Sequence, residues 1–512
     1  MAPAARKGAS LSQATQVLDK AGARHLLRRA GFGAAPDAIA PLVGLTGVEA
    51  ASRLVDEAVA STGMEEPDWA NTQPPHQYAS EAAFEEFFSL NEAWWLELAG
   101  NITESQVQGG LLERLTVFWH DHFVTSFDSY FISAFAWRYW KTLETHALGN
   151  FRDFVRTMGL QPAMLYYLDG YLNEKAAPNE NYARELLELF TMGPRDSAGN
   201  VNYTEEDIAQ IARALTGWTV DWHRLDVYFN RFLHDTGEKT FLGRTGEFDY
   251  DQVVDIVFET RGPQIAEFIC AKLYREFVHE VPDPGVIAEL ADTMVQSDFE
   301  LEPVIRQLLT SSQLQDEALR GAQIKMPVQL MVGMVTELGI PLDEDLRLGL
   351  YWGPAELNQW ILFPPNVAGW PGYRDWINTN TLPLRWDFGG WFIYHNQEMT
   401  DDAVRAFATA LHDPNDAAAP FKLAVAIAEH VMPVPLEQAH ITDGGNPQFA
   451  GDLVNNPIPQ EVLDWPEYRQ VVARRFLTGF PWYEWVLQRQ EAPQLIRYFL
   501  YNLVRQPEYQ LT

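Results

Sequence analysis

Apolar side chains recur along most of the chain at the i, i+3 and i+4 spacing of an amphipathic α-helix. Strand-like alternation is rare and short, and its best example is Lys239 to Leu242 in a glycine-rich stretch. The pattern predicts an all-α fold, a large globular array of many helices with long irregular loops and little or no β-structure. The predicted helices span residues 36–60 (a pair broken at Gly44), 84–99, 105–124, 132–146, 150–158, 180–192, 204–217, 249–258, 263–279, 285–296, 301–311, 326–338, 401–411, 419–431, 465–478 and 492–505.

Two of these helices begin with the spacing of a capping box, in which the cap and the third helical residue bond to each other. Thr204 precedes Asp207, and Asp249 precedes Gln252. We therefore expect helices to start at Thr204 and Asp249.

Three stretches of the chain lack the helical spacing of apolar residues and separate the predicted helices. They are predicted as two long loops, 219–248 and 360–386, and as a surface excursion over 432–462. The expected organisation is a flexible N-terminal tail over 1–10, a main helical domain over 11–390 and a C-terminal helical region over 391–512 that packs on it.

The chain is strongly acidic, which limits its partners. It has 37 Lys and Arg residues against 70 Asp and Glu residues, a net charge of −33. A surface of that sign repels phosphate backbones and anionic lipid headgroups. Binding to nucleic acid and insertion into membranes are therefore not expected.

Cys270 is the only cysteine, so a disulfide within the chain and a thiolate zinc cluster are both excluded. No apolar run is long enough for a membrane span, and Met1 to Leu26 has no continuous apolar stretch of the kind that a signal peptide needs. The expected location is the cytoplasm, with export together with a partner as the alternative.

Eight segments spread over the chain form one ordered set of motifs: LLRRAGFG (26–33), FWHDHF (118–123), PNENYARELLELFTMG (178–193), YTEEDIAQIARALTGW (203–218), HDTGEKTFLG (234–243), IKMPVQL (324–330), FPPNVAGWPGYRDWIN (363–378) and RQPEYQL (505–511). Together these segments resemble a bacterial family catalogued as a domain of unknown function, number 1800. The resemblance implies a mainly helical single unit and no established activity. Genes of this kind often lie beside one for a protein similar to phosphatases and sulfatases, which implies such a protein as a partner.

His120, His122 and His234 are the candidate metal ligands. His120 and His122 lie two residues apart, roughly 200° around a regular helix, so they share a site only if the helix ends there. The metal would be divalent, such as zinc, iron, copper or manganese. The alternative is that one histidine is hydrogen-bonded in the core and Asp121 is solvated.

Charged residues in two motifs are the candidate catalytic groups. Glu180, Arg184 and Glu185 lie on one predicted helix, and Asp235 and Lys239 lie in a loop. The alternative for the helix is a solvent-exposed ladder of ion pairs, and for the loop a glycine-shaped turn. The pair Glu276 and His279 has Glu-x-x-His spacing, but a dinuclear site needs two such pairs, so it is discounted.

Aromatic and polar residues of two motifs are the candidate substrate-binding groups. Aromatic rings interspersed with donors can form a ligand wall, although they more often pin an irregular loop onto helices. The candidates are Arg213, Trp218, Asn366, Trp370, Arg374 and Trp376.

Two functions remain open from the sequence. The first is a metal-dependent enzyme, a hydrolase or an oxidoreductase, in which His120, His122, Glu185 and His234 approach one another. The second is a non-catalytic partner or assembly protein for the phosphatase-like or sulfatase-like neighbour. The density of charged residues in motifs far apart in sequence favours the enzyme.

Overall fold

The computed structural model describes residues 11–416, 418–444 and 448–512. Within these residues 21 α-helices and two small two-stranded sheets form a mainly helical body, as predicted. The tail predicted over 1–10 lies outside the described residues. The helices are α1 Lys20–Ala30, α2 Pro36–Ile39, α3 Gly47–Ala60, α4 Glu81–Gln108, α5 Leu111–His122, α6 Ser133–His146, α7 Phe151–Gly159, α8 Pro162–Tyr167, α9 Asn181–Glu188, α10 Glu205–Ala214, α11 Tyr250–Phe277, α12 Pro284–Gln296, α13 Leu301–Leu309, α14 Pro327–Leu338, α15 Glu344–Glu356, α16 Thr381–Tyr394, α17 Asp401–Leu411, α18 Ala419–Val431, α19 Gln460–Leu463, α20 Glu467–Phe476 and α21 Ala492–Val504.

Both predicted capping boxes are present. The Thr204 side chain accepts from the Asp207 amide while the Asp207 carboxylate accepts from the Thr204 amide, and Asp249 and Gln252 do the same. The two helices therefore begin where the sequence places them.

Two helix breaks differ from the prediction. The gap expected between 99 and 105 is absent, because α4 continues to Gln108. The helices predicted over 249–258 and 263–279 form one element, α11, with non-helical backbone at Arg261 (φ −130°, ψ 17°) two residues before Pro263. Proline lacks the amide that would bond one turn back and its ring crowds that carbonyl, so the helix kinks there.

The long loop predicted over 219–248 contains two β-hairpins, and the strand-like stretch at Lys239 is one of their strands. The strands are β1 Trp218–Asp221, β2 Asp226–Phe229, β3 Lys239–Phe241 and β4 Arg244–Gly246, and each pair is antiparallel. Leu242 and Gly243 connect β3 to β4 with φ of +48° and +77°, the left-handed turn that suits a two-residue hairpin. Strands of three or four residues are too short to show a period of two.

Helices α1, α8, α15, α16 and α19 had no counterpart in the predicted pattern. In α1 the reason is visible, because Arg24, Arg28 and Arg29 are all buried, so its inner face is charged. A search for apolar spacing passes over such a helix.

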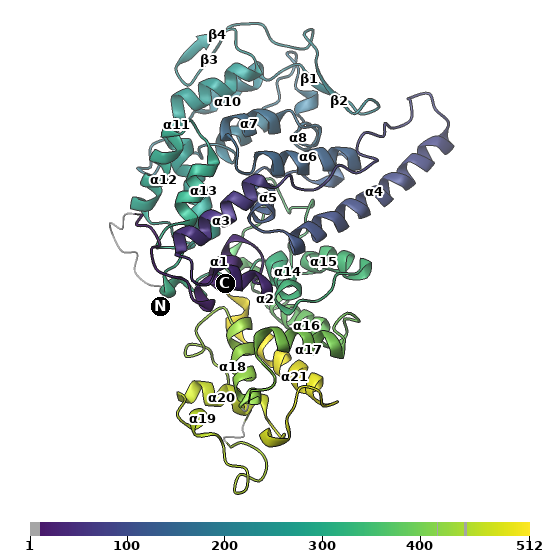
Figure 1. The fold of residues 1–512 in the computed structure, drawn as a ribbon. Coiled ribbons are helices and arrows are strands. Elements are labelled where there is room, and N and C mark those ends of the chain that lie inside the picture. The colour runs from purple at the N-terminus through teal and green to yellow at the C-terminus, as the bar shows by residue number, and fades with distance from the viewer. Residues whose placement is uncertain (1–10, 417, 445–447) are drawn as a thin grey trace.

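The apolar core forms two clusters. The first runs from Leu18 to Trp376 and the second from Leu330 to Tyr509, and α14 contributes to both. Figure 1 shows the second cluster's helices α17 to α21 as a lower lobe beneath the rest of the molecule. The domain division predicted after residue 390 falls within α16 and stays a prediction.

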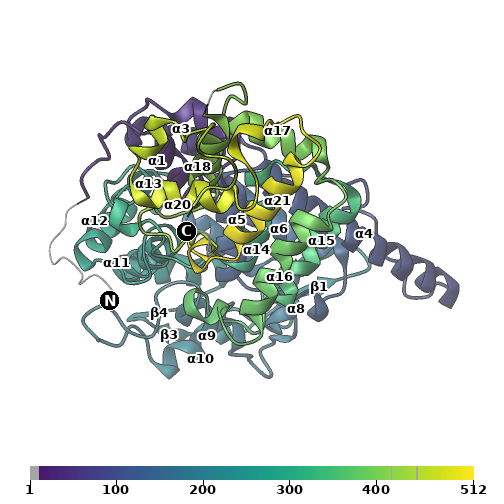
Figure 2. The ribbon, with the colours of Figure 1, turned by 90° about the horizontal axis from the view of Figure 1, so that it is seen from below.

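Helix α4 extends away from the main body, and both views show its free end (Figures 1 and 2). Among the described residues, every helix is too short or too polar to span a lipid bilayer.

Candidate functional site

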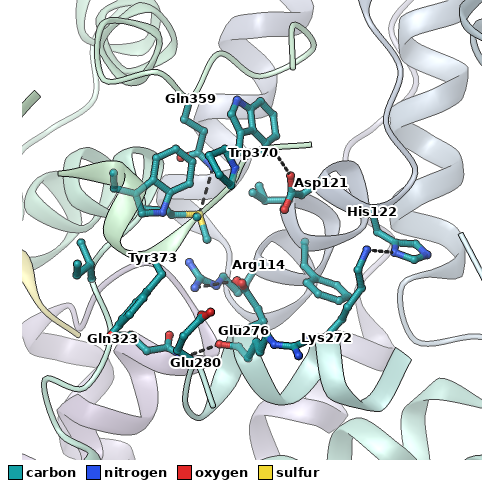
Figure 3. A pocket seen from close by; sticks show the side chains of 18 of the residues that line it. Arg114, Asp121, His122, Lys272, Glu276, Glu280, Gln323, Gln359, Trp370 and Tyr373 are labelled. Carbon is teal, nitrogen blue, oxygen red and sulfur yellow. Dashed lines mark hydrogen bonds and ion pairs between the residues drawn. The ribbon is translucent and has the colours of Figure 1, made fainter. Parts of the chain in front are cut away.

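A cavity of about 270 Å³ lies where the end of α5, the second half of α11 and the loop over 368–376 meet (Figure 3). Residues 323, 324 and 326, which lead into α14, close a further side. We call this cavity the Asp121 pocket. It joins three of the motifs singled out in the sequence, those at 118–123, 324–330 and 363–378.

Local structure explains how the motifs meet. Helix α5 ends at His122, so Asp121 lies in its last turn. Lys272 and Glu276 lie one turn apart on α11, beyond the kink, and both face the pocket. Gly369 has φ of +81°, and a Cβ atom there would lie 2.2 Å from Asp121 Oδ1. Only glycine lets the loop approach Asp121 so closely.

Asp121 is the acid of the pocket. Its Oδ1 accepts a hydrogen bond from the Trp370 amide at 2.7 Å, and Oδ2 has no hydrogen-bond partner among the described residues. Burial raises the pKa of this carboxyl from its ordinary 3.8 to about 7, against the opposing effects of the Trp370 amide and the Lys272 charge. The carboxyl group is therefore able to gain or lose a proton near neutral pH.

Lys272 is the base of the pocket. Its Nζ lies 2.9 Å from His122 Nδ1, and its other two donors have no partner among the described residues. Burial lowers the pKa of this amine from 10.5 to about 8, although the Asp121 charge acts in the opposite direction. A lysine in such surroundings can act as a proton donor, a base or a nucleophile.

His122 fixes the position of Lys272. Its Nε2 lies 3.0 Å from the Phe190 carbonyl oxygen, which cannot donate, so Nε2 carries the proton. Nδ1 is then the acceptor for the Lys272 ammonium. Burial, followed by the Lys272 charge, holds the pKa of His122 well below its usual range, so the imidazole stays neutral.

A second charged pair lies beside these groups. Arg114 Nη2 is 2.8 Å from Glu276 Oε1, although the contact lacks the alignment of a hydrogen bond, and the Arg114 guanidinium lies over the Phe32 ring at 5.7 Å. Arg114 Nε and Nη1 are buried without a partner among the described residues. This guanidinium therefore keeps unused donors near the pocket.

His120 points to the other side of α5, as its spacing from His122 predicts. The Leu362 amide donates to Nε2 at 3.0 Å, so Nδ1 carries the proton and donates to Tyr139 Oη at 2.6 Å. Tyr139 in turn donates to the Phe123 carbonyl at 2.8 Å. Both ring nitrogens of His120 are thus engaged in holding α5, α6 and the 361–363 segment together.

The structure does not bring His120, His122, His234 and Glu185 together. His234 Nδ1 bonds to the Thr216 carbonyl at 2.9 Å, and Glu185 lies on α9. In the residues that the structure describes, no group of three or more His, Cys, Asp or Glu side chains could hold a metal ion. The spacing of the histidines could not reveal this, because their partners are main-chain groups, a tyrosine and a lysine from other segments.

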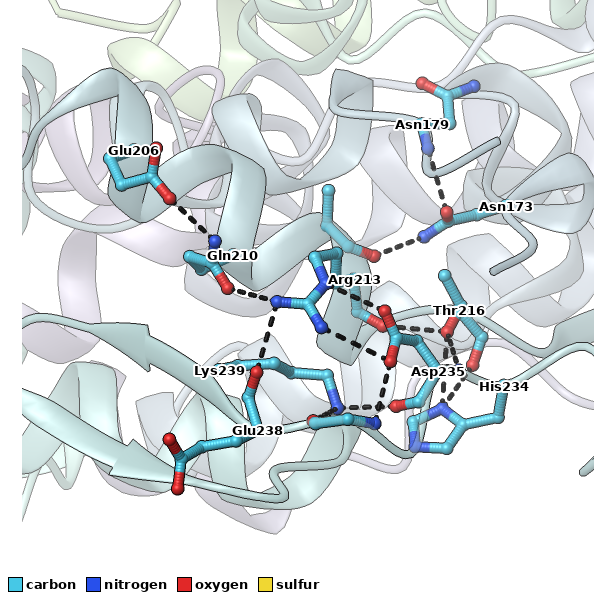
Figure 4. A network of polar contacts seen from close by, with 12 residues as sticks. Asn173, Asn179, Glu206, Gln210, Arg213, Thr216, His234, Asp235, Glu238 and Lys239 are labelled. Atoms are coloured by element: carbon cyan, nitrogen blue, oxygen red, sulfur yellow. Dashed lines mark hydrogen bonds and ion pairs between the residues drawn. The ribbon is translucent and has the colours of Figure 1, made fainter. Parts of the chain in front are cut away.

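Asp235, Lys239 and Arg213 do come together, around a loop rather than a cavity (Figure 4). We call this set, with His234, the Asp235 network. Arg213 Nε donates to Asp235 Oδ2 at 2.7 Å, and Lys239 Nζ donates to the carbonyl oxygens of Asp235 and Gly237. Arg213 holds the loop onto α10, and the Lys239 ammonium points inward to carbonyls of the loop itself. This arrangement fits the glycine-shaped turn, which was the alternative for this motif, better than it fits a catalytic site.

Glu180, Arg184 and Glu205 form a chain of ion pairs on the surface of α9 and α10. Arg184 lies 3.2 Å from Glu180 and 2.8 Å from Glu205, and their side chains are 35%, 46% and 78% exposed. Glu185 is half-buried, and burial raises its pKa. The three paired residues match the ion-pair ladder weighed above.

The six predicted substrate-binding residues divide into several groups. Trp370 and Trp376 are buried and line the Asp121 pocket, while Asn366 and Arg374 are exposed on the same loop. Trp218 packs in β1 against Phe229 and Tyr250, and Arg213 belongs to the Asp235 network.

Sequence reasoning selected none of four residues of the pocket, Arg114, Asp121, Lys272 and Glu276. Asp121 was expected to be solvated in the alternative without a metal, and Glu276 was discounted as part of a single Glu-x-x-His pair. Each lies on a helix whose other side is apolar, and charged residues there look like a solvated face. One signal was present, the four-residue spacing of Lys272 and Glu276 on α11. Only the fold shows that this face meets Asp121.

Comparison with known proteins identifies the family of the chain. No curated protein and no solved structure matches the chain. A family model described as "Protein of unknown function (DUF1800)" matches residues 25–511, a span that contains the Asp121 pocket and the Asp235 network. The chain therefore belongs to the DUF1800 family.

Proposed function

We propose that this protein is an enzyme that catalyses proton transfer on a small polar molecule bound in the Asp121 pocket. The observation that carries the proposal is that Asp121 and Lys272 face one cavity with hydrogen-bonding capacity that no described residue uses, while His122 holds Lys272 in place. Charged side chains that only support the fold usually have hydrogen-bond or ion-pair partners. Polar groups that face a cavity without such partners are typical of active sites.

The chemistry follows from the two titrating groups. With pKa values of about 7 and about 8, Asp121 and Lys272 can exchange protons with a substrate near neutral pH. Asp121 would accept a proton from the substrate and Lys272 would donate one to the group that develops negative charge. Because the two charges act on each other, the pair titrates as a unit.

The size and lining of the pocket limit the substrate. A volume of about 270 Å³ suits a small metabolite rather than a polymer segment. Arg114 and Arg275 would hold a carboxylate or another anionic group, and Trp370 and Tyr373 would cover an apolar part. The loop over 368–376 thus contributes three rings to the pocket, those of Trp370, Tyr373 and Trp376.

The experiment is a ligand screen read by thermal unfolding, with small carboxylic acids, carbonyl compounds and esters, on wild type, Lys272→Met and Asp121→Asn. We expect compounds that stabilise the wild type, lose their effect in both variants and are converted by the wild type. The exposed Lys175→Met is the matched control and should behave as wild type. Compounds that stabilise all four proteins alike, with no turnover, would refute the proposal.

The metal predicted from the histidines is tested separately. Metal content of untagged wild type is measured by mass spectrometry beside His120→Ala and His234→Ala. Near-stoichiometric zinc, iron, copper or manganese that is lost in both variants would support a shared metal site and contradict the proton-transfer site proposed here.

The partner hypothesis gives a different result. A protein that serves a phosphatase-like or sulfatase-like neighbour should co-purify with it after co-expression, and the complex should survive Lys272→Met. Such a complex, together with a failed ligand screen, would replace the enzyme proposal.

A further inference from the structure

A second cavity, of about 300 Å³, lies between α1 and the C-terminal lobe. One wall is a face of α1, and the others are the segment 432–437 after α18, the start of α20 and Arg320. Figure 1 shows α1 directly above α18, where the two parts of the molecule meet. None of its lining residues belongs to the Asp121 pocket.

The cavity is cationic although the chain carries a net charge of −33. Lys20, Arg24 and Arg28 recur every four residues along one face of α1, and residues from two other segments add to them. The lining includes five cationic side chains, Lys20, Arg24, Arg28, Arg320 and Arg469, against three carboxylates, Asp19, Glu429 and Glu437. We call it the Arg24 cavity.

Two of the three carboxylates are already engaged. Asp19 caps α1 and accepts from the Gly22 amide at 2.8 Å, and Glu429 accepts from Arg469 at 2.8 Å. Arg28 is satisfied by Glu337, which lies outside the cavity, and by main-chain carbonyls such as that of Met432. None of these groups forms an ion pair or hydrogen bond with Arg24, although the charges of Glu429, Asp19 and Glu337 act on it at longer range.

Arg24 is 8% exposed, and no hydrogen bond or ion pair joins it to any described residue. Burial, and then the charge of Arg28, lowers its pKa to about 10, so it remains protonated at neutral pH. Arg320 is paired with Glu317 through Nη1 at 3.3 Å, but its buried Nε has no hydrogen-bond partner among the described residues. A buried guanidinium that no carboxylate contacts is costly, and such groups usually pair with an anion.

We propose that the Arg24 cavity binds the phosphate or carboxylate group of a small anionic molecule, with Arg24 as its principal ligand. The guanidinium fork is suited to two oxygens of either group. Arg320 and Tyr468 line the cavity from other sides and provide further donors. The site does not depend on the function proposed above, since the two cavities share no residue.

The test uses the full chain with sodium phosphate and sodium succinate, each compared with sodium chloride at equal ionic strength. Affinity is measured by calorimetry and stability by thermal unfolding. We expect one of the two anions to bind the wild type and to bind Arg24→Met at least tenfold more weakly. Arg53→Met, which removes an exposed arginine of α3, is the matched control and should bind as wild type.

The possible outcomes distinguish a phosphate site from a carboxylate site, and they test the Arg24 cavity independently of the Asp121 pocket. Binding of phosphate alone identifies a phosphate site, and binding of succinate alone a carboxylate site. Lys272→Met should keep the affinity, so failure of the Asp121 pocket would not affect this test. If neither anion binds beyond the chloride control, or if Arg24→Met binds as the wild type does, the proposal is wrong.

The stability of the ligand-free variant provides a second criterion. Removal of a buried charge that has no partner should leave the melting temperature unchanged or raise it. A clear fall in Arg24→Met, repeated in Arg24→Gln, would show that Arg24 supports the fold through contacts of its own, and would overturn the proposal.

Discussion

The Asp121 pocket and the Asp235 network contain the same kinds of residue, an aspartate, a lysine, an arginine and a histidine. In the network, Asp235 and Lys239 bond to groups within the same loop and to Arg213. In the pocket, Asp121 keeps one oxygen and Lys272 keeps two donors without a described partner. Residue type alone therefore does not identify a site, whereas unused hydrogen-bonding capacity inside a cavity does.

The largest effect is expected at Lys272. Lys272→Met removes the proposed proton donor, and turnover of the substrate found by the screen should fall by at least about 10²-fold. The free energy of unfolding should change little, because the substitution also removes the unfavourable partial burial of the Lys272 charge. Steady-state kinetics and thermal unfolding measure the two effects. A loss of stability with normal kinetics would show that Lys272 supports the fold, as the residues of the Asp235 network do, and is not a catalytic residue.

Gly369→Ala should disturb the pocket through the backbone. The new Cβ would lie 2.2 Å from Asp121 Oδ1, and φ of +81° is unfavourable for alanine. We expect a loss of roughly 2–4 kcal/mol in the free energy of unfolding, measured with denaturant. Gly243→Ala, in the turn between β3 and β4, is the matched control, since its φ is also positive, at +77°, but its Cβ would meet no atom within 4 Å. Equal losses in both variants would contradict the close approach to Asp121.

Lys239→Met should show the opposite pattern to Lys272→Met. Lys239 is 1% exposed and donates to two main-chain carbonyls of its own loop. Its removal leaves both acceptors unpaired, and we expect a loss of about 2 kcal/mol in unfolding free energy with kinetics unchanged. Reduced turnover at unchanged stability would bring the Asp235 network back as a catalytic site.

The pH dependence of stability distinguishes the two groups of the pocket. Asp121 has a raised pKa, so from about pH 4 to 7 the folded state holds a proton that the unfolded state has released, and stability falls as pH rises. Lys272 has a lowered pKa, so from about pH 8 to 10.5 the unfolded state holds the extra proton, and stability rises with pH. The pocket thus costs the fold most between about pH 7 and 8.

Denaturant unfolding across pH tests this for wild type, Asp121→Asn and Lys272→Met. The difference from wild type should change by on the order of 1–3 kcal/mol over each range, with opposite signs for the two variants. Parallel curves for all three proteins would mean that neither group is shifted.

The smallest effect is expected on α9. Arg184→Met breaks two ion pairs that are open to solvent, and we expect a loss below about 1 kcal/mol that shrinks further in high salt. Thermal unfolding at two salt concentrations measures it. A larger loss that does not depend on salt would show that Glu180, Arg184 and Glu205 contribute more to stability than a solvent-exposed ladder of ion pairs does.

The fold was largely predictable, because helices with an apolar stripe reveal themselves by spacing, and Thr204 and Asp249 mark their starts. Helix α1 was not, because its buried face includes three arginines. The site was predictable only in part. His122, Trp370 and Trp376 were selected and line the pocket, but Lys272 lies on a helix of ordinary composition, beyond the kink at Arg261, and only the fold places it beside Asp121.

Helix α14 places Val328 and Val332 in the first core cluster and Leu330, Met331 and Met334 in the second. Both clusters therefore include side chains of this one helix, and the two lobes share an element of their cores. The protein should consequently melt in one cooperative calorimetric transition, and a fragment that ends before α14 should not fold by itself.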